Sequence, residues 1–159
     1  MGAVLLGDFA AVLDQLLPLM GPDGATFVTR VNNTASPPDH KAMSQIFIDR
    51  HGIARAWSEF LAQYPLVLTP TWTKLPFEHG FDVATLEGTA ATMELMRPVV
   101  PANLLGLPSA CVPVGRDQAT GLPIGVLLSG PRFREDLCLD AAEAIQQRCR
   151  LNTPINPAG

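Results

Sequence analysis

The sequence predicts an α/β fold in which a partial mixed sheet is layered with helices. Three short apolar runs, at residues 66–69, 109–114 and 124–129, are typical of buried strands. Two longer stretches, 36–64 and 135–150, repeat apolar residues at helical spacing. Because only a short connection separates the second and third runs, these two strands are expected to pair antiparallel.

The N-terminal part of the chain is predicted to be mainly helical. Residues 8–20 place their apolar side chains on one helical stripe, and Asp8 can cap the start. Gly21–Gly24 joins glycines to a proline as turns do, so this helix is expected to end there. For residues 25–35 two interpretations stay open, a short strand at Thr26–Thr29 or irregular structure.

A second helix is predicted to begin at Ser36-Pro-Pro-Asp39. Ser36 can cap it, Asp39 stands three residues later as in a capping box, and the prolines fit a first turn. Gly52 weakens the middle of the stretch, so one helix or two are open, and Pro65 ends it. One face carries the apolar residues Met43, Ile46, Phe47, Ile53, Ala54, Trp57, Phe60 and Leu61.

The rest of the chain alternates strands with helices. A loop containing Pro76, Gly80 and Gly88 follows the first strand, and a helix is predicted over Thr89–Arg97. Asn103–Pro108 is predicted to be a turn-rich link. The closing helix has the clearest pattern, with acidic residues in its first turn, arginines in its last, and one apolar stripe: Leu137, Cys138, Ala141, Ala142, Ile145 and Cys149.

These elements are expected to form a single unit over residues 1–159. Within it, residues 8–64 are mainly helical, 66–150 hold the strands and the closing helix, and 151–159 form a tail. Hydrophobic residues make up 47% of the chain and charged residues 16%, against about 25% charged in ordinary soluble domains. Either the core is large, or apolar surface packs against something outside the chain.

Composition argues against several classes of partner. The net charge is −4 and the basic residues are scattered, so no surface for nucleic acid or anionic lipid is predicted. No apolar run approaches the roughly 18 residues of a membrane span, and the N-terminus lacks a signal-peptide pattern. We therefore expect a cytoplasmic protein that binds neither nucleic acid nor membrane.

No cofactor or metal is predicted either. The sequence has no phosphate-cradling glycine loop and no dinucleotide fingerprint. Cys111, Cys138 and Cys149 are widely spaced and the three histidines fall in other segments, so no zinc ligand set is formed. We interpret the cysteines as reduced structural thiols.

Four sequence motifs follow one another in the second half of the chain. Tyr64–Thr71 ends in Leu-Thr-Pro-Thr, and Asn103–Gly115 runs from Asn-Leu-Leu-Gly-Leu-Pro into a strand. Gly121–Leu127 reads Gly-Leu-Pro-Ile-Gly-Val-Leu, and Glu135 opens a helix with Glu-Asp-Leu. Each motif is weak alone, but in this order, with these gaps, they resemble the amidase-signature family from about Trp57 onward.

The resemblance implies the C-terminal part of an amidase-signature domain. It also implies a parent enzyme that hydrolyses the carbon–nitrogen bond of a small-molecule carboxamide through an acyl-serine. The chain departs from the family pattern with Pro65 for an aspartate, Ser109 for an alanine and Leu127 for a glutamine. Leu127 removes a polar group, which puts in doubt any active-site network that the glutamine supports.

The catalytic half of the family pattern is not found in this sequence. The family carries its nucleophile, bridging serine and base lysine around a Gly-Gly-Ser-Ser-Gly-Gly run, and this chain has no adjacent serines. Its serines are interpreted as isolated from one another, and its lysines are Lys41 and Lys74. Lys74 is a solvated loop cation or, as an open alternative, the base of a dyad with Ser109. No catalytic residue is assigned.

Two residues are candidates for a substrate pocket. Trp72 follows the first strand, and ligands of α/β sheets gather beyond strand ends; it either faces a pocket or packs between layers. Asn103 either bonds a backbone turn or faces a substrate.

Two hypotheses follow for the chain as a whole. In the first, it is the C-terminal portion of an amidase, itself non-catalytic and separated from its N-terminal half. In the second, it is a stand-alone non-catalytic module that binds a small molecule or completes a split amidase. Both leave apolar surface without cover, so a homo-oligomer or a partner chain is expected.

Overall fold

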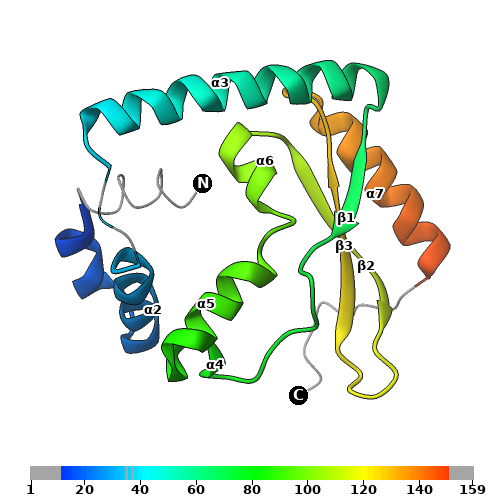
Figure 1. Ribbon diagram of the computed structural model, residues 1–159. Coiled ribbons are helices and arrows are strands. Elements are labelled where there is room, and N and C mark those ends of the chain that lie inside the picture. The colour runs from blue at the N-terminus through cyan, green and yellow to red at the C-terminus, as the bar shows by residue number, and fades with distance from the viewer. Residues whose placement is uncertain (1–11, 35, 37, 151–159) are drawn as a thin grey trace.

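The computed structural model describes residues 12–34, 36 and 38–150 and has an α/β architecture (Figure 1). Residues 12–16 are helical and lead into a short 3-10 helix. The elements follow in the order η1 (Leu17–Leu19), α2 (Pro22–Asn32), α3 (His40–Gln63), β1 (Val67–Pro70), α4 (Phe81–Ala84), α5 (Leu86–Leu95), α6 (Val100–Leu105), β2 (Ser109–Arg116), β3 (Pro123–Ser129) and α7 (Glu135–Cys149).

The three strands form one antiparallel sheet in the order β1-β3-β2. The predicted antiparallel hairpin of β2 and β3 is confirmed, with Cys111 opposite Leu127 and Ser109 opposite Ser129. β1 pairs with the other side of β3 and sets Thr69 opposite Leu127. The central strand β3 is therefore hydrogen-bonded along both edges, and its last three residues, Leu127–Ser129, are buried.

The closing helix packs on the sheet as its apolar stripe predicts. Cys138 and Ala142 are buried, while Leu137, Ala141 and Ile145 are half-buried. The buried cluster joins this helix to both strands of the hairpin through Val112, Leu128 and Ala142. In the view of Figure 1, α7 lies on one side of the sheet, and α5 and α6 lie on the other. Asp140, Glu143 and Gln147, which are not part of the stripe, are exposed.

One prediction for the N-terminal part is wrong. Residues 22–32 form helix α2, where a turn followed by a strand or irregular segment was expected. Gly21 takes an extended conformation at the N-cap and Pro22 occupies the first helical position, where the missing N–H of proline removes no hydrogen bond. The Gly21-Pro22 pair therefore starts a helix here. The predicted cap Asp8 and the tail lie outside the described residues.

Helix α3 is continuous across Gly52 and begins three residues later than expected. Asp39, and not Ser36, is its N-cap, since the Asp39 carboxylate accepts a hydrogen bond from the Ala42 amide at 2.7 Å. The helix has 24 residues, and Leu61 is the buried residue among them. Phe47, Ile48, Ile53 and Phe60 are exposed along it although most of them lie on the predicted apolar face.

The helix predicted over Thr89–Arg97 is present as α5 and begins three residues earlier, while α4 and α6 occupy segments that were not predicted to be helical. Gly88 lies inside α5, because Thr85 caps this helix through the Gly88 amide and a Cβ on Gly88 would lie 2.2 Å from the Phe81 carbonyl oxygen. Helix α6 replaces part of the expected link. Arg50 and Arg132 hold its C-terminal end, donating to the carbonyl oxygens of Leu104 and Leu105. Across the described residues, none of the helices has the length and apolarity to cross a bilayer.

Candidate functional site

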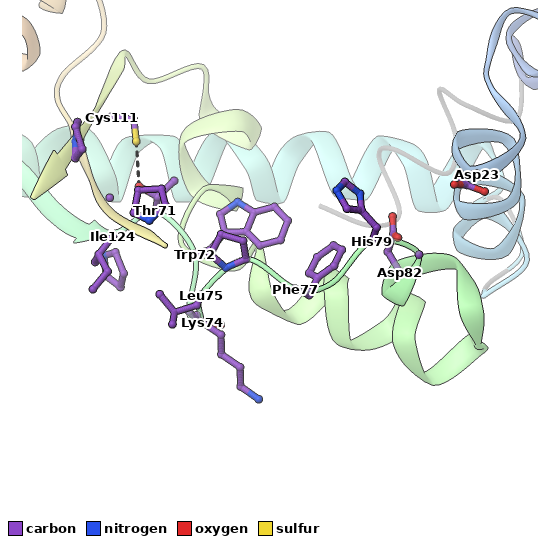
Figure 2. A pocket seen from close by; sticks show the side chains of 17 residues that line it. Asp23, Thr71, Trp72, Lys74, Leu75, Phe77, His79, Asp82, Cys111 and Ile124 are labelled. Atoms are coloured by element: carbon purple, nitrogen blue, oxygen red, sulfur yellow. Dashed lines mark hydrogen bonds between the residues drawn. The ribbon is translucent and has the colours of Figure 1, made fainter. Parts of the chain in front are cut away.

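A hollow of about 900 Å³ lies beyond the end of β1 (Figure 2). The loop from Thr71 to Gly80 forms one wall, and the facing ends of β2 and β3 form the other. Helices α2 and α4 border its far end through Asp23 and Asp82. Its volume is within the range of small-molecule sites, about 300–1,000 Å³.

A chain of aromatic rings follows the loop wall. The ring centroids of Trp72 and Phe77 are 5.9 Å apart, and those of Phe77 and Phe81 are 5.3 Å apart, with planes inclined by 40° and 43°. These separations are typical of interacting aromatic pairs, so each ring helps to fix the next. Trp72 and Phe77 are only half-buried, and both line the hollow.

The strand wall depends on close packing around Gly125. The Thr71 amide donates to the Gly125 carbonyl at 3.2 Å, which extends the β1–β3 pairing by one residue. The Thr71 hydroxyl lies 3.1 Å from the Cys111 thiol across the hollow's floor. A Cβ on Gly125 would lie 3.1 Å from the Thr71 Oγ1 and 3.4 Å from the Cys111 Sγ. Glycine at this position therefore gives the two polar side chains the room to meet.

Charge is unevenly distributed around the hollow. Figure 2 shows Cys111 and Ile124 at one end, and His79, Asp82 and Asp23 at the other. The Lys74 side chain extends away from the aromatic rings. The part of the hollow between Trp72 and the strands is thus lined mainly by apolar side chains, with Thr71 and Cys111 on its floor, and carboxylates stand at its far end.

The structure places the two candidate pocket residues differently. Trp72 lines the hollow. Asn103 lies on α6, is exposed, and is not among the described residues that line the hollow. Its backbone amide donates to the Val99 carbonyl at 3.2 Å. The roles of both residues toward a substrate stay predictions.

Sequence reasoning did not assign Phe77, Cys111 or Ile124 to a pocket, although all three line the hollow. The first lies in the loop that also carries Trp72, five residues further on. The other two come from neighbouring strands. Their signal is the hairpin register, which sets Cys111 opposite Leu127 and Ile124 opposite Gly115.

The interpretation of the serines as isolated from one another is wrong for two of them. The Ser109 and Ser129 hydroxyl oxygens lie 2.8 Å apart, because the two residues face each other across β2 and β3. Ser129 is buried and Ser109 is exposed. Among the described residues, no hydrogen bond joins Ser109 to a lysine, and a serine hydroxyl without an adjacent base is a poor nucleophile.

The Cys138 thiol is also unsuited to nucleophilic attack. The Cys138 Sγ donates to the Pro108 carbonyl at 3.5 Å. Burial raises the pKa of the Cys138 thiol, and the negative charges of Glu135 and Asp136 raise it further. The thiol form therefore dominates at neutral pH, and Cys138 packs as a small apolar side chain.

Leu127 takes the place of the family's glutamine in a buried position. It is 7% exposed and stands opposite Cys111 and Thr69 on the central strand. An apolar side chain suits this environment, so the sheet tolerates the departure. Within the described part of the chain, no group of three or more His, Cys, Asp or Glu side chains is placed to hold a metal ion.

Comparison with known proteins defines the family. The family model Amidase matches residues 20–139, and the chain belongs to this family. It is 42% identical over 111 residues to an indoleacetamide hydrolase of Bradyrhizobium japonicum. The aligned residues cover 69% of this chain and 23% of the relative. It is 53% identical over 103 residues to a fatty acid amide hydrolase of Medicago truncatula, covering 63% of this chain and 17% of the relative.

The chain spans about a fifth of the length of these relatives.

Solved structures show the same fold. 6-Aminohexanoate cyclic dimer hydrolase in complex with substrate matches with a TM-score of 0.69 and 19% identity, over 94% of this chain and 34% of that one. The S177A variant of Kluyveromyces lactis allophanate hydrolase matches with a TM-score of 0.69 and 21% identity, over 89% and 23%.

Proposed function

We propose that this chain forms the substrate-pocket wall of an amide hydrolase and does not itself supply the nucleophile. The parent reaction is hydrolysis of a carboxamide carbon–nitrogen bond through an acyl-serine. The observation that carries the proposal is the hollow beyond β1, lined by Trp72, in a chain that belongs to the Amidase family. Ligands of α/β sheets bind at such strand ends.

The arrangement of the serines supports the proposal that the nucleophile and its base lie outside this chain. Acyl transfer requires a hydroxyl activated by a base and preorganised donors for the oxyanion. The Ser109–Ser129 pair offers two hydroxyls to each other and accepts no hydrogen bond from a lysine among the described residues. The base and the oxyanion donors would come from the part of the relatives' length that this chain does not span.

A segment exchange tests the pocket role. In the Bradyrhizobium japonicum indoleacetamide hydrolase, the matching segment is replaced by the corresponding residues of this chain, and hydrolysis of indoleacetamide is measured. We expect a folded hybrid to retain activity, with the unaltered relative as control. A hybrid with native circular dichroism and thermal transition but no hydrolysis contradicts the proposal.

The chain alone provides the complementary test. We expect no hydrolysis of simple aryl or aliphatic amides above background, and no labelling by a serine-directed fluorophosphonate. Stoichiometric labelling of Ser109 would show that the nucleophile lies in this chain. A Ser109→Ala variant serves as the control that any label found is specific to this hydroxyl.

The partner of this chain is proposed to cover the exposed face of α3. Phe47 and Phe60 are 45% and 47% exposed on this helix, and exposed apolar surface of this kind favours association. We expect the chain alone to form dimers or larger species in light scattering. Replacing both residues by Ser should weaken self-association by roughly tenfold, as expected for the loss of two apolar contacts. A monodisperse monomer at high concentration contradicts this prediction.

A further inference from the structure

The walls of the hollow have the composition of a binding site for a ring. Trp72 and Phe77 form one side, with their ring centroids 5.9 Å apart. Pro113, Pro123 and Ile124 form the side contributed by the strands. A flat aromatic group is stabilised here both by burial of its apolar surface and by offset or edge contacts with these rings. An aliphatic group is stabilised by burial of its surface alone.

The position of the charges restricts the ligand further. Among the described residues that line the hollow, the acidic and basic side chains are Asp23, Asp82, His79 and Lys74, and the Lys74 side chain extends away from the rings (Figure 2). The two carboxylates stand at the end bordered by α2 and α4. The described part of the lining holds two carboxylates and one lysine, so a negatively charged ligand is repelled more than a neutral ligand of the same shape.

The floor supplies a chemical reporter of occupancy. Cys111 is exposed and lines the hollow, and its Sγ lies 3.1 Å from the Thr71 hydroxyl. Cys138 is buried, and Cys149 is half-buried on the far end of α7. A ligand in the hollow would therefore shield Cys111 from a thiol reagent and leave Cys149 unaffected.

We propose that the hollow binds the aromatic ring of a neutral carboxamide, with the ring held between Trp72 and Ile124. The proposal rests on the function proposed above and specifies its substrate class. Hydrolysis of such an amide gives a carboxylate of the same ring. The hollow then binds the product more weakly than the substrate, because the carboxylate meets the negative end.

The test is the rate at which N-ethylmaleimide alkylates Cys111, measured by peptide mass spectrometry on the full chain. The probe is 1-naphthaleneacetamide, and 1-naphthaleneacetate and isovaleramide are compared at the same concentration. When the aromatic amide is present at several times its dissociation constant, we expect it to lower the rate of Cys111 alkylation roughly fivefold. The acid and the aliphatic amide should protect several-fold less, and Cys149 should react at its original rate.

Two variants locate the ring. Trp72→Ala should abolish protection of Cys111, while Trp57→Ala on α3, which does not line the hollow, should keep it. Ile124→Ser is a second variant at a position 40% exposed, where loss of folding is not expected, and it should weaken protection. Protection that survives both pocket variants overturns the proposal, as does equal protection by isovaleramide or by the acid.

The outcomes separate this proposal from the proposed function. No protection by the aromatic amide, with an active segment-exchange hybrid, overturns the ring site alone. Protection with an inactive folded hybrid supports the ring site and overturns the hydrolase role. If Cys111 reacts slowly without probe and dilution restores its rate, a second copy of the chain occupies the hollow, and the small-molecule proposal is wrong.

Discussion

Helices α3 and α7 have similarly regular apolar patterns but very different surroundings. α7 has 15 residues and buries Cys138 and Ala142 against the hairpin of β2 and β3. α3 has 24 residues, and Leu61 is its buried one. The comparison shows that periodicity predicts a helix and its apolar face, while the neighbour that covers this face must be found in the structure or outside the chain.

The difference also locates the stable part of the molecule. The buried cluster of Val112, Leu128 and Ala142 comes entirely from β2, β3 and α7. The exposed apolar residues of α3, among them Ile48 at 63%, add no comparable burial. We infer that the hairpin and α7 hold most of the free energy of unfolding of the chain alone.

The largest expected effect is a direct contrast between the two regions. Leu128 is 4% exposed, and Leu128→Ala should reduce the free energy of unfolding by about 2–5 kcal/mol, through lost burial and a residual cavity. Ile48→Ala should change it by no more than about 0.5 kcal/mol. Urea denaturation of both variants at low protein concentration measures the contrast. Similar losses for the two variants would show that α3 is packed in solution.

The fold could be predicted where local pattern and tertiary contact agree. The strands of the hairpin and α7 have short connections, and the partners they need are adjacent in the chain. The predictions failed at residues 22–32 and 100–105, where each helix has a proline in its first two positions. Proline at a helix start and proline in a turn look alike in sequence, and the long-range bonds from Arg50 and Arg132 that hold α6 leave no local signal.

The candidate site could be predicted only in part for a similar reason. Trp72 was found because a strand end is recognisable from its own sequence. The Ser109–Ser129 contact, like the place of Cys111 beside Thr71, depends on strand register, which joins residues 20 and 40 positions apart. A register that is fixed by turn geometry and a bulge between Pro113 and Gly115 is not evident from composition or spacing.

A smaller effect tests the packing of α7 itself. Ile145 is half-buried against the hairpin cluster, so Ile145→Ala should reduce the free energy of unfolding by about 1–2 kcal/mol. Gln147 is exposed, and its side-chain amide donates to the Glu143 carboxylate at 3.1 Å. A side-chain pair of this kind, four residues apart on a helix, contributes about 0.2–0.5 kcal/mol to stability. Gln147→Ala is therefore the matched control on the same helix. Equal losses at both positions would contradict the orientation of α7.

The smallest expected effect concerns the turn between β2 and β3. The Asp117 carboxylate accepts hydrogen bonds from the Thr120 hydroxyl and amide, both at 2.8 Å, and from the Ala119 amide. The Thr120 hydroxyl, first among these, lowers the pKa of Asp117 below its ordinary value of 3.8. Since the pKa is lowered in the folded state, this stabilisation is present above the unfolded-state pKa and is lost as pH falls through the folded-state value.

Replacing Thr120 by Val removes the hydroxyl and should move the pKa of Asp117 up toward 3.8, because one of the bonds that favour the carboxylate is lost. The pKa is followed by the carboxyl carbon chemical shift of Asp117 in an NMR titration. Asp136 is the control within the same molecule, since Arg134 lowers its pKa independently of the turn. An Asp117 pKa that stays unchanged in Thr120→Val, with Asp136 also unchanged, would show that the turn does not form this hydrogen bond in solution and that the hairpin is held by its strands and α7 alone.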